Sequence, residues 1–390
     1  MRTMHPVLKR GALLWDRDLL PPACYAARFG RIQSLIAEEG DDAWLLFGDV
    51  ERYGHVAYFS NFLPRTRSAL ALVPSRGDPT ILVAAGPRDI PAAKTLTWIE
   101  DVRPLGNAGP QVCALIAEKE LAKARIGLIG IEESLALPEW NAITAGLPQT
   151  QWRNRTAAMM GLRRVKDRFE QAALRRSALA VAHALDAVPQ LIRPGMTTRQ
   201  LAAAVDRQLR LAGAEDVRIL VAGGTQCGRS LRPADDILLQ QGDEVMFYAA
   251  AEMQRYWAEA ARTFVLGCAA AALQALAGRA VAALAAMRAA VAPGVRIADL
   301  HARAEAELAD AELRASASAY GYGHGIGLDA EEPPYVLAGS EERIAEGATL
   351  ALRVIGHSGG QGIALGNVIM AGAAGAEVLI EAPGLIECEM

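Results

Sequence analysis

A histidine enclosed by glycines is the first feature of the sequence that could carry chemistry. His324 stands in the stretch Gly321-Tyr-Gly-His-Gly-Ile-Gly327. The ordinary pKa of a histidine side chain is about 6.5, so an imidazole can accept and release a proton at neutral pH. His324 is therefore a candidate general acid or base, with packing in a glycine-rich turn as the alternative. The stretch is not a nucleotide motif, because it lacks the G-x-G-x-x-G register.

Two other reactive side chains also stand in glycine-rich segments. His357 lies in Gly356-His-Ser-Gly-Gly360. We expect this glycine-rich segment to be a mobile loop over a ligand-binding cleft, so His357 is a candidate for substrate binding. Cys227 lies in Gly223-Gly-Thr-Gln-Cys-Gly228. A thiol nucleophile needs an activating base, and no histidine neighbours Cys227 in the sequence. A nucleophilic role for Cys227 is therefore not favoured.

The elements that must position these side chains begin with an alternation of strands and helices over residues 1–150. Hydrophobic periodicity predicts helices at residues 28–39 and 111–121, and strands at residues 43–48, 68–74, 80–84 and 125–131. This alternation is typical of an α/β layer with a mixed sheet.

A polar stretch separates this part from the rest of the chain. Residues 149–160 are expected to be irregular, and a long helical pattern then starts at Leu162 and runs to about Ile192. A chain of 390 residues is long enough for two domains. We therefore predict two domains, residues 1–160 and residues 161–390.

An internal repeat organises the second part of the sequence. Pro194-Gly-Met-Thr-Thr-Arg-Gln-Leu201 recurs 99 residues later as Pro293-Gly-Val-Arg-Ile-Ala-Asp-Leu300. Each copy ends one helix at Pro-Gly and opens another, expected to run to about Ala212 and Leu313. Strand-like segments follow at residues 216–222, 244–250, 349–355 and 367–371. Two helix–helix–strand halves related by a pseudo-two-fold axis would leave a central cleft, where a small-molecule site is expected.

Short segments spread over nearly the whole chain carry a family resemblance. They are Tyr58-Phe-Ser-Asn-Phe62, Leu162-Arg-Arg-Val-Lys166 with Glu170, Gly242-Asp243, Arg262-Thr-Phe264, Gly323-His-Gly-Ile-Gly-Leu328 and Glu332-Pro333. In order and spacing they resemble the superfamily of creatinase, prolidase and methionine aminopeptidase, which includes the Xaa-Pro peptidases. The resemblance implies a mixed α/β (α+β) protein, with a creatinase-like N-terminal α/β domain followed by a pita-bread domain that contains the pseudo-two-fold repeat.

The metallopeptidases of this superfamily hold two divalent cations with two Asp, one His and two Glu, because such cations need several anionic oxygens. Carried over by the resemblance, those five positions are Tyr248, Glu259, His324, Arg353 and Gly366. One imidazole and one carboxylate cannot hold two metal ions, and a guanidinium would repel them. The resemblance therefore predicts a protein without a metal or any other cofactor.

The substituted positions supply candidate catalytic and binding groups. Arg353, at a position that faces the cleft in the family, could anchor a substrate carboxylate or a developing oxyanion. Glu259 could orient His324, bind a cationic substrate or pair with Arg353. Tyr248 offers a phenol near Arg353, with space filling as the alternative.

Two positions outside the metal set also differ from the family. Arg229 stands near the place of a substrate-side histidine and is assigned to substrate binding, while Glu331 takes the place of a second histidine. The resemblance points Glu331 toward the pocket in a catalytic role, and an exposed carboxylate in a turn is the alternative. Glu252 lies at a predicted hairpin turn and is expected to be solvated.

Two arginines of the first domain are further candidates for substrate binding. Arg65 and Arg67 follow Phe62-Leu-Pro64. Creatinase-like N-terminal domains offer a cation to a substrate carboxylate, often across a dimer interface, so the resemblance also predicts a homodimer. Surface solvation of both arginines is the alternative.

The composition excludes several other classes of protein. The chain has 40 Lys+Arg against 44 Asp+Glu, a net charge of −4 and no basic block, so no nucleic-acid partner is expected. Its 52% hydrophobic and 22% charged residues are typical of a folded globular protein. The five cysteines are scattered without a C-x-x-C pair, which indicates a cytoplasmic location and no disulfide framework. Neither a signal peptide nor a membrane span is expected.

Three functions stay open on these grounds. The leading hypothesis is a metal-independent, creatinase-like hydrolase acting on a C–N bond of a small carboxylated substrate, since creatinase hydrolyses such a bond without a metal. The alternative is a catalytically inactive peptidase-like protein that binds a small molecule, a peptide or a protein partner. A Xaa-Pro aminopeptidase-like metallopeptidase follows only if the alignment of the five positions is wrong.

Overall fold

The chain divides into two compact units, each with its own sheet and helices. The computed structural model describes residues 15–64, 66–373 and 375–389. The units are Met1–Arg163 and Arg164–Met390. Both mix helices with β-strands, so the predicted α/β class is confirmed. None of the helices in the described ranges is long and apolar enough to cross a membrane.

The first unit is built on a mixed sheet, as its alternating pattern predicts. Six strands of the described chain lie in the order β4-β3-β2-β1-β5-β6. Their bounds are β1(Ala43–Asp49), β2(Ser68–Pro74), β3(Thr80–Val83), β4(Asp101–Pro104), β5(Arg125–Ile129) and β6(Gln151–Asn154). Strand β1 pairs antiparallel with β2 and parallel with β5, so its side chains are buried on both faces.

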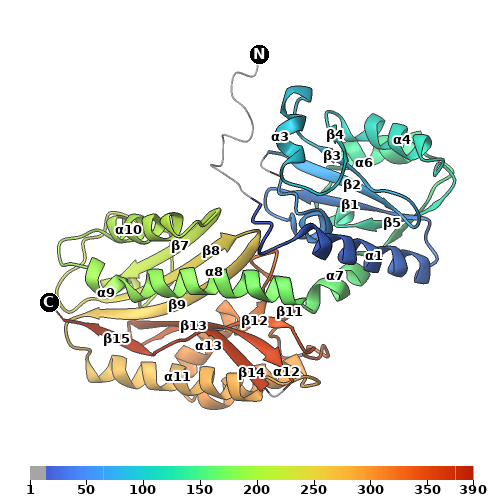
Figure 1. The fold of residues 1–390 in the computed structure, drawn as a ribbon. Helices are drawn as coiled ribbons and strands as arrows, with labels where there is room; N and C mark the ends of the chain where they lie inside the picture. The colour runs from blue at the N-terminus through green and yellow to red at the C-terminus, as the bar shows by residue number, and fades with distance from the viewer. Residues whose placement is uncertain (1–14, 65, 374, 390) are drawn as a thin grey trace. The chain divides into compact units, whose positions relative to one another are not determined.

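Seven α-helices accompany this sheet in the described residues (Figure 1). They are α1(Pro22–Glu38), α2(Gly54–Ser60), α3(Ile90–Lys94), α4(Ala108–Glu118), α5(Ile131–Ser134), α6(Leu137–Gly146) and α7(Thr156–Arg164). The expectation that residues 149–160 are irregular is wrong, because they contain β6 and the start of α7. Strand β6 lies at the sheet edge and is largely exposed, so it lacks the apolar alternation that would reveal a strand.

The second unit is built on a larger sheet. Nine of its described strands form one sheet, in which β11-β10-β12-β13-β9-β8-β7 follow one another, while β14 pairs with β13 and β15 pairs with β9. The bounds are β7(Asp216–Gly223), β8(Glu244–Met253), β9(Tyr256–Leu266), β10(Gly323–Gly325), β11(Glu332–Tyr335), β12(Thr349–Ser358), β13(Gln361–Gly372), β14(Gly375–Ile380) and β15(Leu385–Cys388).

The hairpin between β8 and β9 corrects one expectation. Glu252 is 2% exposed and lies inside β8, so it is not at a solvated turn. The turn falls two residues later, at Gln254 and Arg255, whose φ angles of 50° and 70° are left-handed. Such a two-residue turn matches the twist of the two strands, and here it has no glycine or proline to mark it in the sequence.

Capping side chains divide the helices of this unit more finely than their periodicity predicts. The α-helices of the described residues are α8(Arg168–Asp186), α9(Val188–Leu191), α10(Thr198–Leu211), α11(Ala271–Ala290), α12(Ile297–Glu307) and α13(Ala311–Tyr320). The single helix expected from Leu162 to Ile192 is interrupted at Asp167, which caps α8 through a capping box. The helix expected to run to Leu313 is likewise two helices, because Asp310 caps α13.

The internal repeat is visible in the backbone. Gly195 and Gly294 both adopt a left-handed φ, 81° and 86°, which glycine adopts at little cost. Their N–H groups donate to equivalent carbonyls, Gly195 to Leu239 at 2.7 Å and Gly294 to Ile344 at 2.8 Å. The two copies therefore build the same turn, each at the start of a helix: α10 packs on β7, and α12 packs on α11.

The helices of the two halves leave one face of the sheet for the site. Helices α8 and α10 pack on strands β7–β9, and α11 and α13 pack on β12 and β13 (Figure 1). Along β12, Leu350, Leu352 and Val354 belong to the core that includes α11. Because side chains alternate along a strand, Ala351 and Arg353 point to the opposite face.

The two copies of the repeat differ in their helix caps, and this difference predicts unequal stability effects. Thr197 accepts from the Gln200 N–H in a capping box, whereas Arg296, its counterpart, makes no side-chain cap. We expect Thr197→Ala to lower the free energy of unfolding by about 1 kcal/mol, and the matched change Arg296→Ala to alter it by less than about 0.5 kcal/mol. Urea denaturation followed by circular dichroism measures both values, and equal losses would contradict the assignment of the cap.

Candidate functional site

A row of paired residues runs across four strands of the second unit. Tyr248 on β8 is the register partner of Ala261 on β9, Ala261 pairs with Gly366 on β13, and Gly366 pairs with Arg353 on β12. Directly paired residues present their side chains on the same face of a sheet. Ala261 and Gly366 are small, so the two large side chains at the ends of the row have room to approach each other above them.

A second row, two residues along, adds an acid and a base on the same face. Glu259 lies two residues before Ala261 on β9, and His324 on β10 pairs with Ala351, two residues before Arg353. Since the side-chain period of a strand is two, all four polar side chains converge on one face. The structure thus brings together Tyr248, Glu259, His324 and Arg353, which the sequence proposes as site residues.

Short contacts connect these four side chains. The Tyr248 hydroxyl donates to Glu259 Oε2 at 2.8 Å. His324 Nε2 lies 3.5 Å from Glu259 Oε1 and 3.2 Å from Arg353 Nη1. Arg353 Nη1 is itself 3.5 Å from Glu259 Oε1. The cluster therefore holds one carboxylate, one guanidinium, one imidazole and one phenol within contact of one another.

The orientation of the imidazole follows from its second nitrogen. His324 Nδ1 lies 2.9 Å from the carbonyl oxygen of Gly325. A carbonyl only accepts, so Nδ1 carries a proton and donates it there. In the neutral imidazole Nε2 then has a free lone pair, which faces Arg353 and Glu259. His324 can thus take up a proton at Nε2 without rotating its ring.

The charges in the cluster shift the pKa values of its members in opposite directions. Burial acts to raise the pKa of Glu259, but His324, Arg353 and the Tyr248 hydroxyl outweigh burial and the pKa is lowered. Burial acts to lower the pKa of His324, but the Glu259 carboxylate prevails and the pKa is raised. Burial and Glu259 raise the pKa of the Tyr248 phenol well above its usual value, so the phenol remains a donor.

The cluster reaches solvent on the side of Arg353 and Glu331. The side chains of Glu259 and His324 are 4% and 2% exposed, whereas that of Arg353 is 17% exposed and that of Glu331 is 56% exposed. Glu331 Oε1 lies 3.7 Å from His324 Nε2 and 3.8 Å from Arg353 Nη1. Glu331 therefore faces the cluster from its rim with more than half of its side chain exposed, and its catalytic role stays a prediction.

Arg353 also binds two backbone carbonyls that were not predicted as part of the site. Its Nη2 donates to the Tyr320 carbonyl at 3.2 Å and its Nε to the Gly321 carbonyl at 3.4 Å. These carbonyls stand at the end of α13 and just after it, where helix carbonyls lack helical partners. The only sequence signal for them is the glycine at 321, which ends the helix.

The donor set of this cluster does not fit a two-metal centre. Guanidinium Nη1 contacts both His324 and Glu259, so a fixed cation occupies the place between the two potential ligands. Across the ranges that the structure describes, no three His, Cys, Asp or Glu side chains are grouped so that they could hold a metal ion.

Four further residues are predicted to bind substrate: Arg229, His357, Arg65 and Arg67. Arg229 is exposed in the loop after β7, and Arg67 is exposed in the first unit. His357 lies in strand β12 rather than in a mobile loop, so that expectation is wrong: β12 extends to Ser358, and the His357 ring lies 3.3 Å from Glu312. Arg65 lies outside the described residues. Substrate-binding roles for these residues stay predictions.

Two buried groups beside the site have structural explanations. Cys227 Sγ donates to the carbonyls of Ala222 and Glu244 at 3.2 and 3.3 Å, and burial raises its pKa far above the usual value, so the thiol is a poor nucleophile. Glu332, next to Glu331, forms a buried ion pair with Lys166. This pair holds the start of β11, the residue directly after Glu331.

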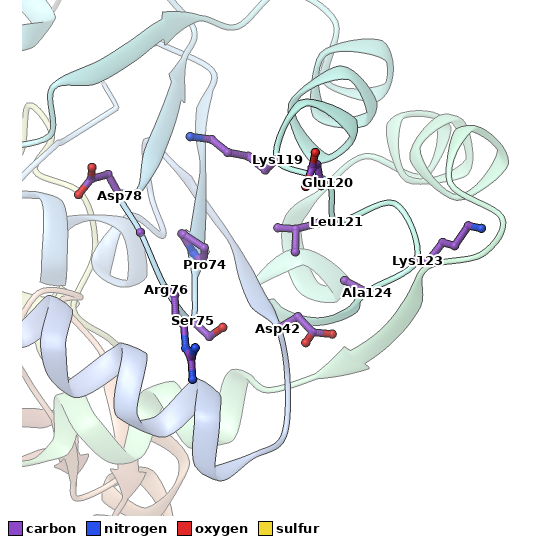
Figure 2. A pocket seen from close by; sticks show the side chains of 11 residues that line it. Asp42, Pro74, Ser75, Arg76, Asp78, Lys119, Glu120, Leu121, Lys123 and Ala124 are labelled. Atoms are coloured by element: carbon purple, nitrogen blue, oxygen red, sulfur yellow. The ribbon is translucent and has the colours of Figure 1, made fainter.

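A separate open pocket of about 520 Å³ lies in the first unit (Figure 2). Its lining residues are Asp42, Pro74, Ser75, Arg76, Gly77, Asp78, Lys119, Glu120, Leu121, Lys123 and Ala124. Charges of both signs surround it, and many of these side chains are exposed and long. It contains no histidine or cysteine, so we place the candidate site at the buried cluster of the second unit.

Comparisons with known proteins place the fold and the family. The model of metallopeptidase family M24 matches residues 172–375, and the creatinase/prolidase N-terminal domain matches residues 28–165. The second unit has the pita-bread fold and the first is a creatinase-like domain, as predicted. The chain belongs to metallopeptidase family M24, a family of hydrolases, and the resemblance to the creatinase and prolidase superfamily is confirmed.

Solved structures show the same fold over almost the whole chain. An X-Pro aminopeptidase from Thermotoga maritima MSB8 has a TM-score of 0.82 and 23% identity, over 92% of this chain and 99% of that one. The dipeptidase PepE from Mycobacterium ulcerans gives 0.82 and 22%, over 97% and 100%. A prolidase from Pyrococcus horikoshii OT3 gives 0.80 and 19%, over 91% and 98%. No curated protein sequence gives a significant match.

The opposing influences on His324 predict the effect of removing its carboxylate neighbour. In Glu259→Gln the pKa of His324 should fall by about one pH unit or more, because burial and Arg353 then lower it without opposition. The raised pKa of the wild type stabilises the fold below pH 6.5, and this stability is lost as pH rises through the folded-state value. An NMR titration of the imidazole protons, assigned with His324→Asn, measures the shift.

A matched control for this prediction is Glu312→Gln. Glu312 faces His357 at 3.3 Å, so its substitution removes another carboxylate–histidine pair of the same unit. It should leave the titration of His324 unchanged. An unaltered midpoint for His324 in Glu259→Gln would show that the carboxylate does not set its protonation.

Proposed function

We propose that this protein is a metal-independent hydrolase of the creatinase type that cleaves a C–N bond of a small carboxylated compound. The observation that carries the proposal is the contact of an oriented base with a fixed cation. His324 Nε2 lies 3.2 Å from Arg353 Nη1 and 3.5 Å from Glu259 Oε1. A proton acceptor and an anion-binding group side by side are the two parts that hydrolysis needs when no metal activates the water.

In the proposed reaction His324 moves one proton. Nε2 takes a proton from a water molecule as the water oxygen bonds to the substrate carbon, and the same proton then passes to the nitrogen as the C–N bond breaks. Glu259 stabilises the transient imidazolium because its carboxylate lies beside Nε2. Hydrogen bonding from the Nδ1 side keeps the ring in place throughout.

Arg353 is the proposed anchor for the substrate. Its guanidinium carries five N–H groups, and its side chain is 17% exposed at the rim. A substrate carboxylate or a developing oxyanion can bind the N–H groups that face solvent. Tyr248 is proposed to hold Glu259 ionised through its 2.8 Å hydrogen bond, and Glu331 to border the entrance.

The proposal extends to assembly and location. We propose a homodimer in which Arg65 or Arg67 supplies a cation across the interface, as the family resemblance implies. All five cysteines are free, which supports a reducing, cytoplasmic location.

One observation favours a second candidate, a catalytically inactive member that binds a small molecule, a peptide or a protein. The polar groups of the cluster already satisfy one another: Arg353 contacts His324, Glu259 and two backbone carbonyls, and Tyr248 contacts Glu259. Such a network can simply fill the space. The two candidates differ in whether Arg353 is needed for a ligand or only for the fold.

Metal content tests the central claim of the proposal. After incubation with Mn, Co, Zn or Fe and removal of free ions, we expect elemental analysis to find no stoichiometric metal, because Tyr248, Arg353 and Gly366 stand at predicted ligand positions and cannot hold such ions. Two tightly bound ions per chain would overturn both the alignment and the metal-independent reaction. A weak single ion at His324 and Glu259 would leave the proposal intact.

Substitution of Arg353 separates the anchor from the space-filling alternative. If Arg353 binds substrate, Arg353→Ala should weaken binding or transition-state stabilisation by roughly 2–4 kcal/mol. Arg353→Lys should recover only part, since an ammonium lacks the planar fork of donors. His324→Asn should abolish turnover and leave binding largely intact. A thermal-shift screen of small carboxylates identifies the ligand for these measurements.

The alternative gives a different pattern in the same proteins. If Arg353 only neutralises Glu259, Arg353→Ala should cost roughly 3–5 kcal/mol of folding free energy, because it strands a buried carboxylate. The double variant Arg353→Ala with Glu259→Ala should then regain much of that stability. Such a rescue, together with no carboxylate that protects the wild type, would reject the hydrolase in favour of the inactive binding protein.

A further inference from the structure

The two halves of the second unit meet in an unusual way beside the site. Among the described residues, the ladder between β9 and β13 consists of the single pair Ala261 and Gly366. From Thr263 to Val265, β15 pairs with one edge of β9 and β8 pairs with the other edge. Both edges of β9 are therefore occupied there, and β13 can no longer pair with β9. Strand β13 instead crosses the face of the sheet that carries the site.

Side chains replace the ladder where β13 crosses. The Thr263 hydroxyl accepts from the Ala364 N–H at 2.8 Å and donates to the Ala364 carbonyl at 3.1 Å. Thr263 is fully buried. A hydroxyl can donate and accept at once, so this single side chain satisfies both backbone groups of Ala364.

A second side chain binds the backbone of β13 two residues earlier in the strand. The Glu244 carboxylate at the start of β8 accepts from the Gly362 N–H at 2.9 Å. Burial raises the pKa of Glu244 to about 7. The titratable groups near it are the Asp243 carboxylate, directly before β8, and the buried Cys227 thiol of the neighbouring loop. Gly362 itself brings no titratable side chain.

The four polar residues of the cluster form two pairs, which come from strands on either side of this crossing. Tyr248 and Glu259 belong to β8 and β9, while His324 and Arg353 belong to β10 and β12. Strand β12 pairs with β13 through ten register partners, so β12 moves with β13. The position of β13 on the face of β9 therefore sets the distance between Glu259 and His324, which is 3.5 Å here.

We propose that Thr263 is a positioning residue for this site: its hydroxyl holds β13 against β9 and thereby keeps Glu259 in contact with His324, with Glu244 as a second clamp. The proposal rests on the proposed role of His324. Without the hydroxyl, the buried N–H and carbonyl of Ala364 lose their partners. Unpaired buried backbone groups are costly, so the strand shifts to regain hydrogen bonds.

The test measures the protonation of His324, which needs no substrate. Thr263→Val keeps the shape of the side chain and removes the hydroxyl. If β13 shifts, Glu259 moves away from His324, and the pKa of His324 falls because the carboxylate no longer raises it. We expect an NMR titration midpoint lower by about half a pH unit or more, in the direction of the Glu259→Gln value. Thr263→Ser, which retains the hydroxyl, should restore the wild-type midpoint.

The chain offers a matched control in the same sheet. Thr349 on β12 is 1% exposed, lies on the same face as Arg353 by the period of the strand, and its hydroxyl has no hydrogen-bond partner among the described residues. Thr349→Val therefore removes a buried hydroxyl that forms no hydrogen bond with the described residues. Its His324 midpoint should equal that of the wild type.

Glu244 supplies an independent pair of variants if Thr263→Val fails to fold. Glu244→Ala removes the clamp and should lower the His324 midpoint, while Glu244→Gln retains a carbonyl oxygen that can accept from Gly362 and should not. A folded Thr263→Val whose thermal stability falls while its His324 midpoint stays at the wild-type value would overturn the proposal. An unchanged midpoint in Glu244→Ala would overturn the role of the second clamp. Neither outcome depends on whether the protein hydrolyses a substrate.

Discussion

The guanidinium of Arg353 sets the charge balance on which the rest of the buried cluster depends. Glu259 is almost fully buried, and an isolated carboxylate there would be very unfavourable. His324, the Arg353 cation and the Tyr248 hydroxyl together keep that carboxylate ionised. The ionised carboxylate in turn raises the pKa of His324 against the effects of burial and of Arg353 itself. The protonation of the one candidate base therefore follows from a competition between two neighbours of opposite charge.

These contacts arise from backbone register more than from any local motif. Tyr248 and Arg353 stand at the ends of one row of paired residues, and the alanine and glycine between them leave the space that both side chains fill. The row exists because, in the part of the chain that the structure describes, β9 and β13 form a backbone pair at that point alone. The repeated Pro-Gly turns place the helices of each half on the other face, so this face is available for polar groups.

Sequence reasoning reached much of this organisation, and its failures have physical causes. The repeat and the two-part architecture could be predicted from residue types and spacing, whereas the five aligned positions came from the family resemblance. Strand β6 was missed because an exposed edge strand has no apolar alternation, and the turn at Gln254 was missed because it lacks glycine. Thr263 and the carbonyls after α13 could not be found, since their role depends on a strand crossing between distant segments.

In the proposed metal-independent hydrolase, a side-chain cation in place of a metal would limit the chemistry that the site can perform. A metal ion with an open coordination position generates a nucleophile from water, which a guanidinium cannot do. What remains is a positioned base, and general acid–base catalysis contributes about 10²–10⁴-fold. Electrostatic stabilisation by Arg353 adds to this only where negative charge develops within its reach. The proposed reaction is therefore suited to a C–N bond whose carbon is already activated, and much less to an ordinary peptide bond. In this proposal the identity of residue 353 sets the class of substrate.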